Sequence, residues 1–156
     1  MKIRIGQKAP AFTLPDQNGT MHSLGELKGK WVLLYFYPKD NTPGCTMEAC
    51  GIRDSFPAFQ KVKAVVFGVS ADTPESHQRF TAKYKLPFTL LSDEDHAVLD
   101  AYGVWGKKKF MGRSFMGISR TSFLIDPQGK IAKVYEGVKP AIHAEEVLKD
   151  LETLAK

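Results

Sequence analysis

Residues 35–56 read YFYPKDNTPGCTMEACGIRDSF, and both cysteines of the chain lie in this stretch. It begins as an apolar strand, breaks at Pro38 and restarts as a helix at Thr42-Pro43, a pair suited to an N-cap and a first helical position. Cys45 then falls in the first turn, where unpaired backbone N–H groups and the helix dipole favour thiolate over thiol. We interpret this stretch as a reactive-cysteine site.

The same helix predicts different surroundings for the two cysteines. The spacing Thr42-x-x-Cys45 is that of a capping box, so the hydroxyl and the sulfur are expected to lie close together. Pro57 is expected to end the helix. Helical periodicity places four residues on one apolar face: Cys45, Ala49, Ile52 and Phe56. Cys45 is therefore expected at the buried end of this stripe, and Cys50 on another side.

Size and composition favour one globular domain over residues 1–156. The chain is 43% hydrophobic and 25% charged, as is usual for globular proteins. No apolar run approaches the roughly 20 residues of a membrane span, and no signal peptide is visible, so no membrane association is expected. Two cysteines do not form a disulfide scaffold, and we expect a reducing, cytoplasmic location.

The net charge of +5 raises the question of a nucleic-acid partner. The basic residues are scattered, and the only tight run, Lys107-Lys108-Lys109, lies outside any recognisable nucleic-acid module. We interpret the run as a solvated loop and expect no nucleic-acid binding. The charge is expected instead to speed encounters with an acidic protein partner.

The order of the predicted elements indicates an α/β fold. Before the cysteine helix we expect an edge strand at 3–5, a hairpin of 12–14 and 21–23, a helical turn capped by Ser23, and a buried central strand at 31–37. After it we expect a parallel strand at 64–70, a helix from Thr73-Pro74 to Tyr84, a strand at 89–91 and a helix at 95–102. A long functional or mobile loop is expected at 104–119. The chain is expected to end with a hairpin of 120–125 and 131–135 and a helix at 143–154. This is a thioredoxin-like fold: a central mixed sheet flanked by helices, with an N-terminal β-hairpin extension.

At this point a family resemblance becomes specific. YPKDNTPGCTMEAC resembles the active-site segment of peroxiredoxins, whose pattern P-x-x-x-[TS]-x-x-C falls on Pro38, Thr42 and Cys45. The second cysteine five residues on is similar to the bacterioferritin-comigratory, or PrxQ-like, branch, as are GVSADTPESHQRF, KYKLPFTLLSD, AYGVWG and SRTSFLIDPQGKI. The similarity runs from KAPAFTLPDQNG to HAEEVL. One departure is Ala71, where this branch often has proline, in a loop without catalytic residues.

The resemblance implies a thiol peroxidase that reduces hydrogen peroxide and organic hydroperoxides. Cys45 would be the peroxidatic nucleophile and would become a sulfenic acid. Cys50 would resolve it as a Cys45–Cys50 disulfide, and thioredoxin or a similar dithiol reductant would recycle the protein. The family also implies a monomer, and no cofactor, because the electrons travel through sulfur.

The resemblance further assigns four supporting residues. Only a few per cent of an ordinary cysteine is thiolate at neutral pH, and a neighbouring cation raises that fraction. By resemblance the cation is Arg120, whose planar fork of donors can reach both the sulfur and a peroxide oxygen. Thr42 would hydrogen-bond the peroxide, Pro38 would shield the sulfur from water, and Glu48 would orient Arg120.

Other interpretations of the same residues stay open. Taken singly, Thr42 could be only a cap, Pro38 only a turn and Arg120 only a surface ion pair. A zinc site would need two of the histidines His22, His77, His96 and His143, which lack the usual paired spacing. A thioredoxin-like dithiol oxidoreductase would carry C-x-x-C. A non-catalytic redox-sensing or chaperone-like protein is the alternative from another class.

Helix geometry makes one further prediction about the cysteine pair. Five residues of an α-helix place the two Cα atoms about 8.6 Å apart, whereas a disulfide tolerates at most about 7 Å. A Cys45–Cys50 disulfide therefore requires residues 43–51 to unwind.

Overall fold

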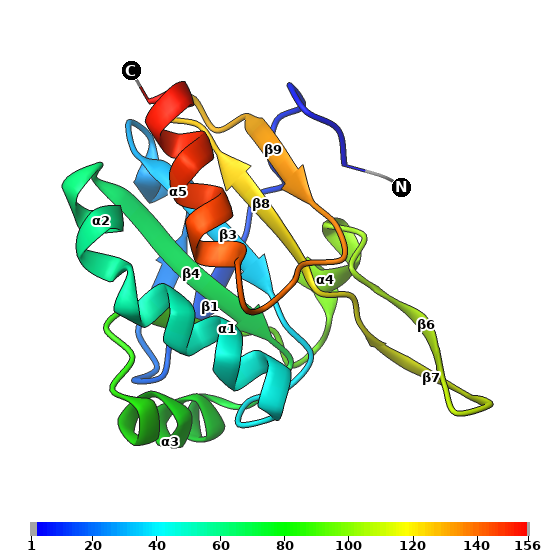
Figure 1. The fold of residues 1–156 in the computed structure, drawn as a ribbon. Helices are drawn as coiled ribbons and strands as arrows, with labels where there is room; N and C mark the ends of the chain where they lie inside the picture. Colours follow the sequence, from blue (N-terminus) through cyan, green and yellow to red (C-terminus); the bar gives the residue numbers. More distant parts are fainter. Residues whose placement is uncertain (1–2, 156) are drawn as a thin grey trace.

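The computed structural model describes residues 3–155 and is built on a five-stranded mixed sheet (Figure 1). The strand order is β5 (Thr89–Ser92), β4 (Ala64–Ser70), β3 (Trp31–Phe36), β8 (Thr121–Ile125), β9 (Ile131–Tyr135). β3 pairs in parallel with β4 and β4 with β5, whereas β8 is antiparallel to both β3 and β9. β3 is thus the central strand, which confirms the prediction drawn from its continuous apolar run.

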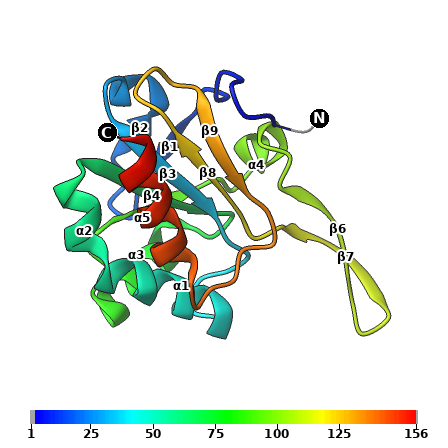
Figure 2. The ribbon, with the colours of Figure 1, turned by 45° about the horizontal axis from the view of Figure 1, so that its top comes forward.

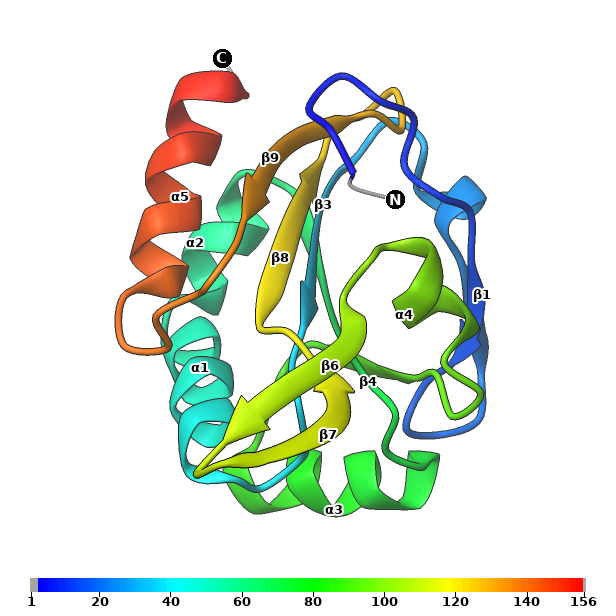
Figure 3. The ribbon, with the colours of Figure 1, turned by 90° about the vertical axis from the view of Figure 1, so that its right-hand side faces the viewer.

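Side chains of β3 alternate between two apolar cores, as the two-residue period of a strand requires. One core lies under α1 (Pro43–Asp54), α2 (Phe56–Lys61) and α5 (His143–Leu154). The other lies under α4 (Ala97–Ala101) and the hairpin of β1 (Thr13–Pro15) and β2 (Met21–Ser23), on the opposite side of the sheet (Figure 3). α3 (Pro74–Tyr84) packs beside β5. The predicted sheet with helices on both faces is confirmed.

The cysteine helix is shorter than predicted. α1 ends at Asp54, and a separate short helix, α2, begins at Phe56 with Pro57 in its first turn. Proline has no N–H with which to extend the α1 ladder, and it suits the first turn of a new helix. Pro57 therefore opens α2, and the prediction that it closes α1 directly is wrong.

The prediction of an N-terminal edge strand at 3–5 is also wrong. Gly6 turns the chain with a φ of 90°, and its N–H donates to the carbonyl of Ile131. Ile3 packs into the core, whereas Ile5 is 65% exposed. The segment is held by single backbone hydrogen bonds and one bridge, Lys8 to Lys130, and not by a ladder.

Residues 104–119 are not a structureless loop. They form a hairpin of β6 (Trp105–Phe110) and β7 (Arg113–Ile118) that projects from the body (Figures 1 and 2). The two turn residues, Met111 and Gly112, both have positive φ, at 51° and 78°, as a tight hairpin turn requires. Methionine rarely takes that conformation, so the turn leaves no recognisable sequence pattern. The lysine run therefore lies in a strand, with Lys107 and Lys109 exposed.

The other predicted elements are present with shifts of one or two residues at their ends, apart from one cap. Ser23 precedes a 3-10 turn, η1 (Leu24–Leu27), but its hydroxyl pairs with that of Thr13 at 2.8 Å and does not cap the turn. Thr73 does cap α3, because its side chain accepts from the N–H of Ser76. The loop between β9 and α5 lies against α1 (Figure 2), where Pro140 faces two glycines of that helix, Gly44 and Gly51.

Candidate active site

Cys45 lies in the first turn of α1 and is only 2% exposed, packed against the core beneath α5. Cys50, in the same helix, is half-buried, and neither cysteine is in a disulfide. The helix is continuous between them. The two thiols therefore have the unequal surroundings that the helical periodicity predicts.

Arg120, 75 positions further along the chain, reaches this sulfur from just before the start of β8. The antiparallel pairing of β3 with β8 aligns Phe36 with Thr121, so Arg120 lies at the sheet end from which the α1 segment departs. Its Nη2 lies 3.5 Å from Sγ of Cys45, and its Nη1 donates to Oε1 of Glu48 at 2.8 Å. One guanidinium thus bridges the sulfur and a carboxylate of the same helix.

Glu48 is the most unusual charge in the site. Its side chain is fully buried, and Oε2 has no hydrogen-bond partner among residues 3–155. Burial raises the pKa of Glu48 from 4.5 to about 7, although the hydrogen bond and charge of Arg120 oppose this rise. Burial also disfavours the charge on Arg120, but Cys45 and Glu48 together raise the pKa of the guanidinium above its ordinary value.

Tyr35, on β3, lies in the same apolar core as Cys45. Its hydroxyl is buried without a hydrogen-bond partner in the described part of the chain. Burial raises the pKa of Tyr35 well above its ordinary value, and the negative charges of Glu48 and Cys45 raise it further. The surroundings of the sulfur are therefore poorly solvated, so the single cation of Arg120 acts there with little screening.

Thr42 and Pro38 precede the sulfur in the loop. Thr42 occupies the N-cap position, and its carbonyl accepts from the N–H of Thr46 at 2.8 Å. Its hydroxyl, however, donates to the carbonyl of Lys39 at 2.8 Å and makes no cap hydrogen bond, so the predicted side-chain cap is wrong. Pro38 is half-buried in the bend that follows β3.

Sequence reasoning missed a buried network that fixes this loop. Asp40 is its centre: Oδ1 accepts from the hydroxyl of Tyr37 at 2.6 Å, and Oδ2 accepts from Ser76 at 2.8 Å and lies 2.7 Å from Nδ1 of His77. The other nitrogen of His77 donates to the carbonyl of Leu91 at 2.9 Å. A recognisable pattern was present, because His77 precedes Phe80 and Tyr84 on the inner face of the predicted helix.

The zinc interpretation receives no support from this geometry. Within residues 3–155, the one group of side chains close enough to hold a metal ion is Asp40, Asp72 and His77, which includes neither cysteine. The atoms of this group already bond one another and their neighbours. The other histidines are dispersed: His22 pairs with Asp16, His143 bonds Ser122, and His96 stacks on Trp105.

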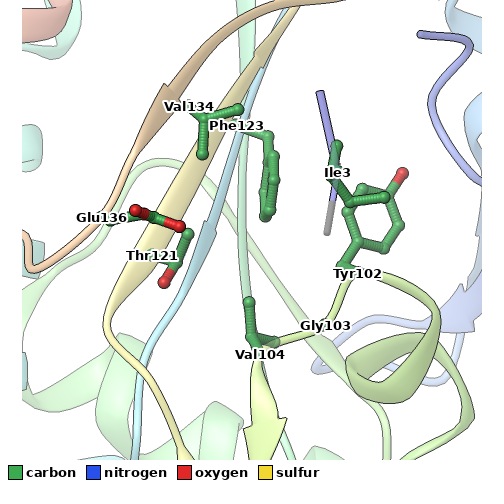
Figure 4. Close-up of a pocket in the computed structure, with 8 residues that line it drawn as sticks. All are labelled: Ile3, Tyr102, Gly103, Val104, Thr121, Phe123, Val134 and Glu136. Carbon is green, nitrogen blue, oxygen red and sulfur yellow. The ribbon is translucent and has the colours of Figure 1, made fainter. Parts of the chain in front are cut away.

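A small cavity lies elsewhere, on the α4 side of the sheet (Figure 4). Its volume is about 50 Å³, and Phe123 and Tyr102 flank it from β8 and from the end of α4. Tyr102 is buried, and its hydroxyl donates to the carbonyl of Pro10 at 2.6 Å. The cavity lies on the opposite side of the sheet from the core that holds Cys45, so it is not the reactive site.

A thioredoxin-like sheet that presents a buried cysteine at a helix N-terminus, beside an arginine, defines a class: enzymes that carry out redox chemistry on a thiol. Comparison with known proteins specifies the family. The sequence pattern of the AhpC/TSA family matches residues 5–134. The peroxiredoxin Bcp of Escherichia coli strain K12 is 50% identical over 146 residues, which cover 94% of each chain.

Solved structures agree with that relationship. A cysteine-to-serine mutant of PrxQ from Xylella fastidiosa superposes with a TM-score of 0.94 at 36% identity, over 100% of this chain and 99% of that one. The bacterioferritin comigratory protein of Xanthomonas campestris gives a TM-score of 0.91 at 38% identity, over 98% and 100%. The chain therefore belongs to the AhpC/TSA family, in its Bcp or PrxQ group of peroxiredoxins, and is a thiol peroxidase. Within residues 3–155, no helix has the length and apolar character that crossing a membrane requires.

Proposed function

We propose that Cys45 is the peroxidatic nucleophile, that Arg120 activates it and that Cys50 resolves it. The observation that carries this assignment is the 3.5 Å contact between Nη2 of Arg120 and the sulfur of Cys45, in the first turn of a helix. A cation and a helix N-terminus both stabilise thiolate. Glu48 holds the guanidinium from its other side and is a positioning residue.

The chemical step is a displacement at oxygen. The thiolate of Cys45 attacks one peroxide oxygen, an S–O bond forms and the O–O bond breaks. Sulfur is oxidised to sulfenic acid, and the departing oxygen takes up a proton to leave as water or an alcohol. The guanidinium of Arg120 faces the sulfur and stabilises the negative charge that develops on the departing oxygen.

Thr42 has a defined polarity in this step. Its hydroxyl has a single hydrogen, which is already donated to the carbonyl of Lys39. Toward a bound peroxide it can therefore only accept, from the O–H of the peroxide, whereas Arg120 can only donate. These opposite roles orient the hydroperoxide group with one defined oxygen toward the sulfur. Pro38, in the same loop, limits the access of water to the sulfur of Cys45.

Resolution consumes the second thiol. Cys50 attacks the sulfenic sulfur of Cys45, a disulfide forms and water leaves, and a thioredoxin-type dithiol then returns two electrons. Because an intact helix holds the two Cα atoms about 8.6 Å apart, residues 43–51 must unwind before a disulfide with its limit of about 7 Å can form. Cys50 and Met47, which is 54% exposed, are the groups that a reductant meets in the opened segment.

The same proposal extends to substrate, assembly and location. The bacterioferritin comigratory protein of Xanthomonas campestris is described as having alkyl peroxide reduction activity, and we propose hydrogen peroxide and organic hydroperoxides as substrates here. We propose a single-domain monomer that works in the cytoplasm without a cofactor. The alternative of a non-catalytic redox-sensing or chaperone-like protein is not favoured by the relatives, which are peroxiredoxins.

A peroxide-consumption assay with a dithiol reductant tests the assignment. The wild-type protein should consume hydrogen peroxide and an alkyl hydroperoxide catalytically, and Cys45→Ser should consume neither. Circular dichroism of the variant controls for folding. Peroxide consumption by folded Cys45→Ser at the wild-type rate would show that another group is the nucleophile.

A further inference from the structure

We infer that Gly44 is a positioning residue, because its missing side chain leaves the space through which Arg120 reaches the sulfur of Cys45. This inference rests on the proposed roles of Cys45 and Arg120. It states that the contact between these two residues depends on the absence of a side chain at position 44. A Cβ atom built on Gly44 would lie 3.0 Å from Nη2 of Arg120, which is the same nitrogen that contacts the sulfur at 3.5 Å.

The backbone conformation does not explain this glycine. Gly44 lies in the first turn of α1, and its φ is outside the left-handed region that favours glycine. Alanine would fit that backbone and is a better helix former than glycine. The close approach of the guanidinium is the contact in the structure that an alanine would disturb.

The neighbours of Arg120 determine which contact gives way. Nη1 is held at 2.8 Å by the buried carboxylate of Glu48. Behind the built Cβ, Cγ of Pro140 lies at 3.8 Å, an ordinary contact that leaves little room for retreat. A methyl group at position 44 therefore pushes the free end of a flexible side chain, and the displacement falls on the contact between Nη2 and sulfur. The fold of the Gly44→Ala variant is therefore expected to be unchanged.

The chain supplies a matched control on the same helix. A Cβ built on Gly51 would meet only the carbonyl oxygen of Pro140, at 3.9 Å, within ordinary van der Waals contact. Gly44→Ala and Gly51→Ala add the same methyl group to the same helix, and both gain helix propensity. They differ in whether Arg120 is in the way.

The test measures the ionised fraction of Cys45 by thiolate absorbance against pH, in the Cys50→Ser background so that one thiol titrates. Among the described residues, Arg120 contacts this sulfur, Tyr35 interacts with it electrostatically, and Glu48 acts on it through Arg120. None of the three is altered in Gly44→Ala. We expect Gly44→Ala to lower the thiolate fraction at neutral pH and to slow reaction with the first equivalent of peroxide about tenfold, the size of one charge-assisted hydrogen bond. Gly51→Ala should leave both quantities unchanged.

A second pair of variants asks whether the effect passes through Arg120. In an Arg120→Met background, Gly44→Ala should change neither the titration nor the rate, because no guanidinium remains to be displaced. A wild-type titration in Gly44→Ala, an equal loss in both backgrounds, or an unfolded Gly44→Ala protein would each overturn the inference. If the parent protein itself lacked Cys45-dependent peroxide reduction, the proposed function would fail instead, while the thiolate titration would still report on Gly44.

Discussion

The loop of residues 37–42 and helix α1 carry adjacent parts of one site, yet different interactions hold them. The loop is fixed by buried hydrogen bonds around Asp40, which joins Tyr37 within the loop and connects the loop to Ser76 and His77 of α3. The N–H of Asp40 also donates to Asp72 at 2.8 Å.

α1, in contrast, is held mainly by its apolar face, by the ion pair of Glu48 with Arg120, and by a hydrogen bond from Arg53 to the carbonyl of Tyr84 at 2.8 Å. Its far half contains half-buried Cys50 and Gly51, which is a poor helix former. The difference separates two tasks. The loop keeps Thr42 and Pro38 in place, whereas the helix is the part that the proposed Cys45–Cys50 disulfide would require to open.

The largest expected effect comes from removing the Cys50 thiol. Cys50→Ser should reduce about one equivalent of peroxide and then stop, because the sulfenic acid on Cys45 has no partner and becomes open to overoxidation. Rapid mixing followed by mass spectrometry measures the stoichiometry and the added oxygen atoms. Folded Cys45→Ser, which should reduce no equivalent, is the control. Loss of the first equivalent in Cys50→Ser, with retention in Cys45→Ser, would reverse the two roles.

The next effect tests the charge of Arg120, which contacts both Cys45 and Glu48 of α1. Arg120→Met should slow the first peroxide equivalent about a hundredfold, because a charge-assisted interaction is lost from both the thiolate and the transition state. Arg120→Lys should restore thiolate formation better than the rate, because an ammonium cannot reproduce the fork. Arg113→Met, in the exposed part of β7, is the control and should be unaffected. Equal restoration of both quantities by lysine would contradict the role of the fork.

Removing the anchor of the loop should cost stability. His77→Ala leaves Asp40 buried without one of its partners, and breaking such a pair costs about 3 kcal/mol in the free energy of unfolding. Urea denaturation measures it. His22→Ala is a matched control, because His22 also lies 2.7 Å from an aspartate oxygen, of Asp16, but is 28% exposed. Similar losses of unfolding free energy in the two variants would show that the buried Asp40 network stabilises the protein no more than the partly exposed pair of His22 and Asp16.

A smaller effect concerns the helix itself. On oxidation to the Cys45–Cys50 disulfide, backbone amides of residues 43–51 should exchange with solvent at least about tenfold faster, because the helix must unwind. Hydrogen exchange with mass spectrometry compares the two redox states, and the anchored loop of residues 37–42 is the internal control. Unchanged protection over 43–51, in a protein whose disulfide is confirmed by mass, would refute the opening.

The smallest effect is a pH dependence of stability. The pKa of Glu48 rises from 4.5 to about 7 on burial, so the folded protein binds this proton more tightly than the unfolded chain. Folding stability therefore decreases as pH rises from about 4.5 to about 7 through this group, and Glu48→Gln should remove that part of the slope. Melting temperatures from pH 5 to 8 measure the difference. Exposed Glu145→Gln should follow the wild-type curve, and a parallel curve for Glu48→Gln would contradict the burial argument.

Much of the fold was predictable because strand and helix periods are local. The apolar run at 31–37, the parallel strand at 64–70 and the helix at 143–154 were all identified from the pattern of their own residues. Predictions failed where a local pattern was ambiguous. The β6–β7 hairpin was not predicted because Met111 is an unusual residue for the left-handed conformation of its turn. The hydroxyl groups of Ser23 and Thr42 form hydrogen bonds with Thr13 and with the carbonyl of Lys39, and not with the backbone N–H groups of the helix ends.

By itself, the sequence determined that Cys45 lies in the first turn of a helix and that Cys50 cannot form a disulfide with it while the helix persists. Both statements depend only on rise, rotation and the unpaired groups of a helix end. The tertiary structure decided everything that joins distant residues: Arg120 beside a sulfur 75 positions away, Asp40 beside His77, and the space above Gly44. The reason is that these contacts depend on which strands pair and in what register. Burial, which raises the pKa of Glu48, exists only once the two cores have formed on the sheet.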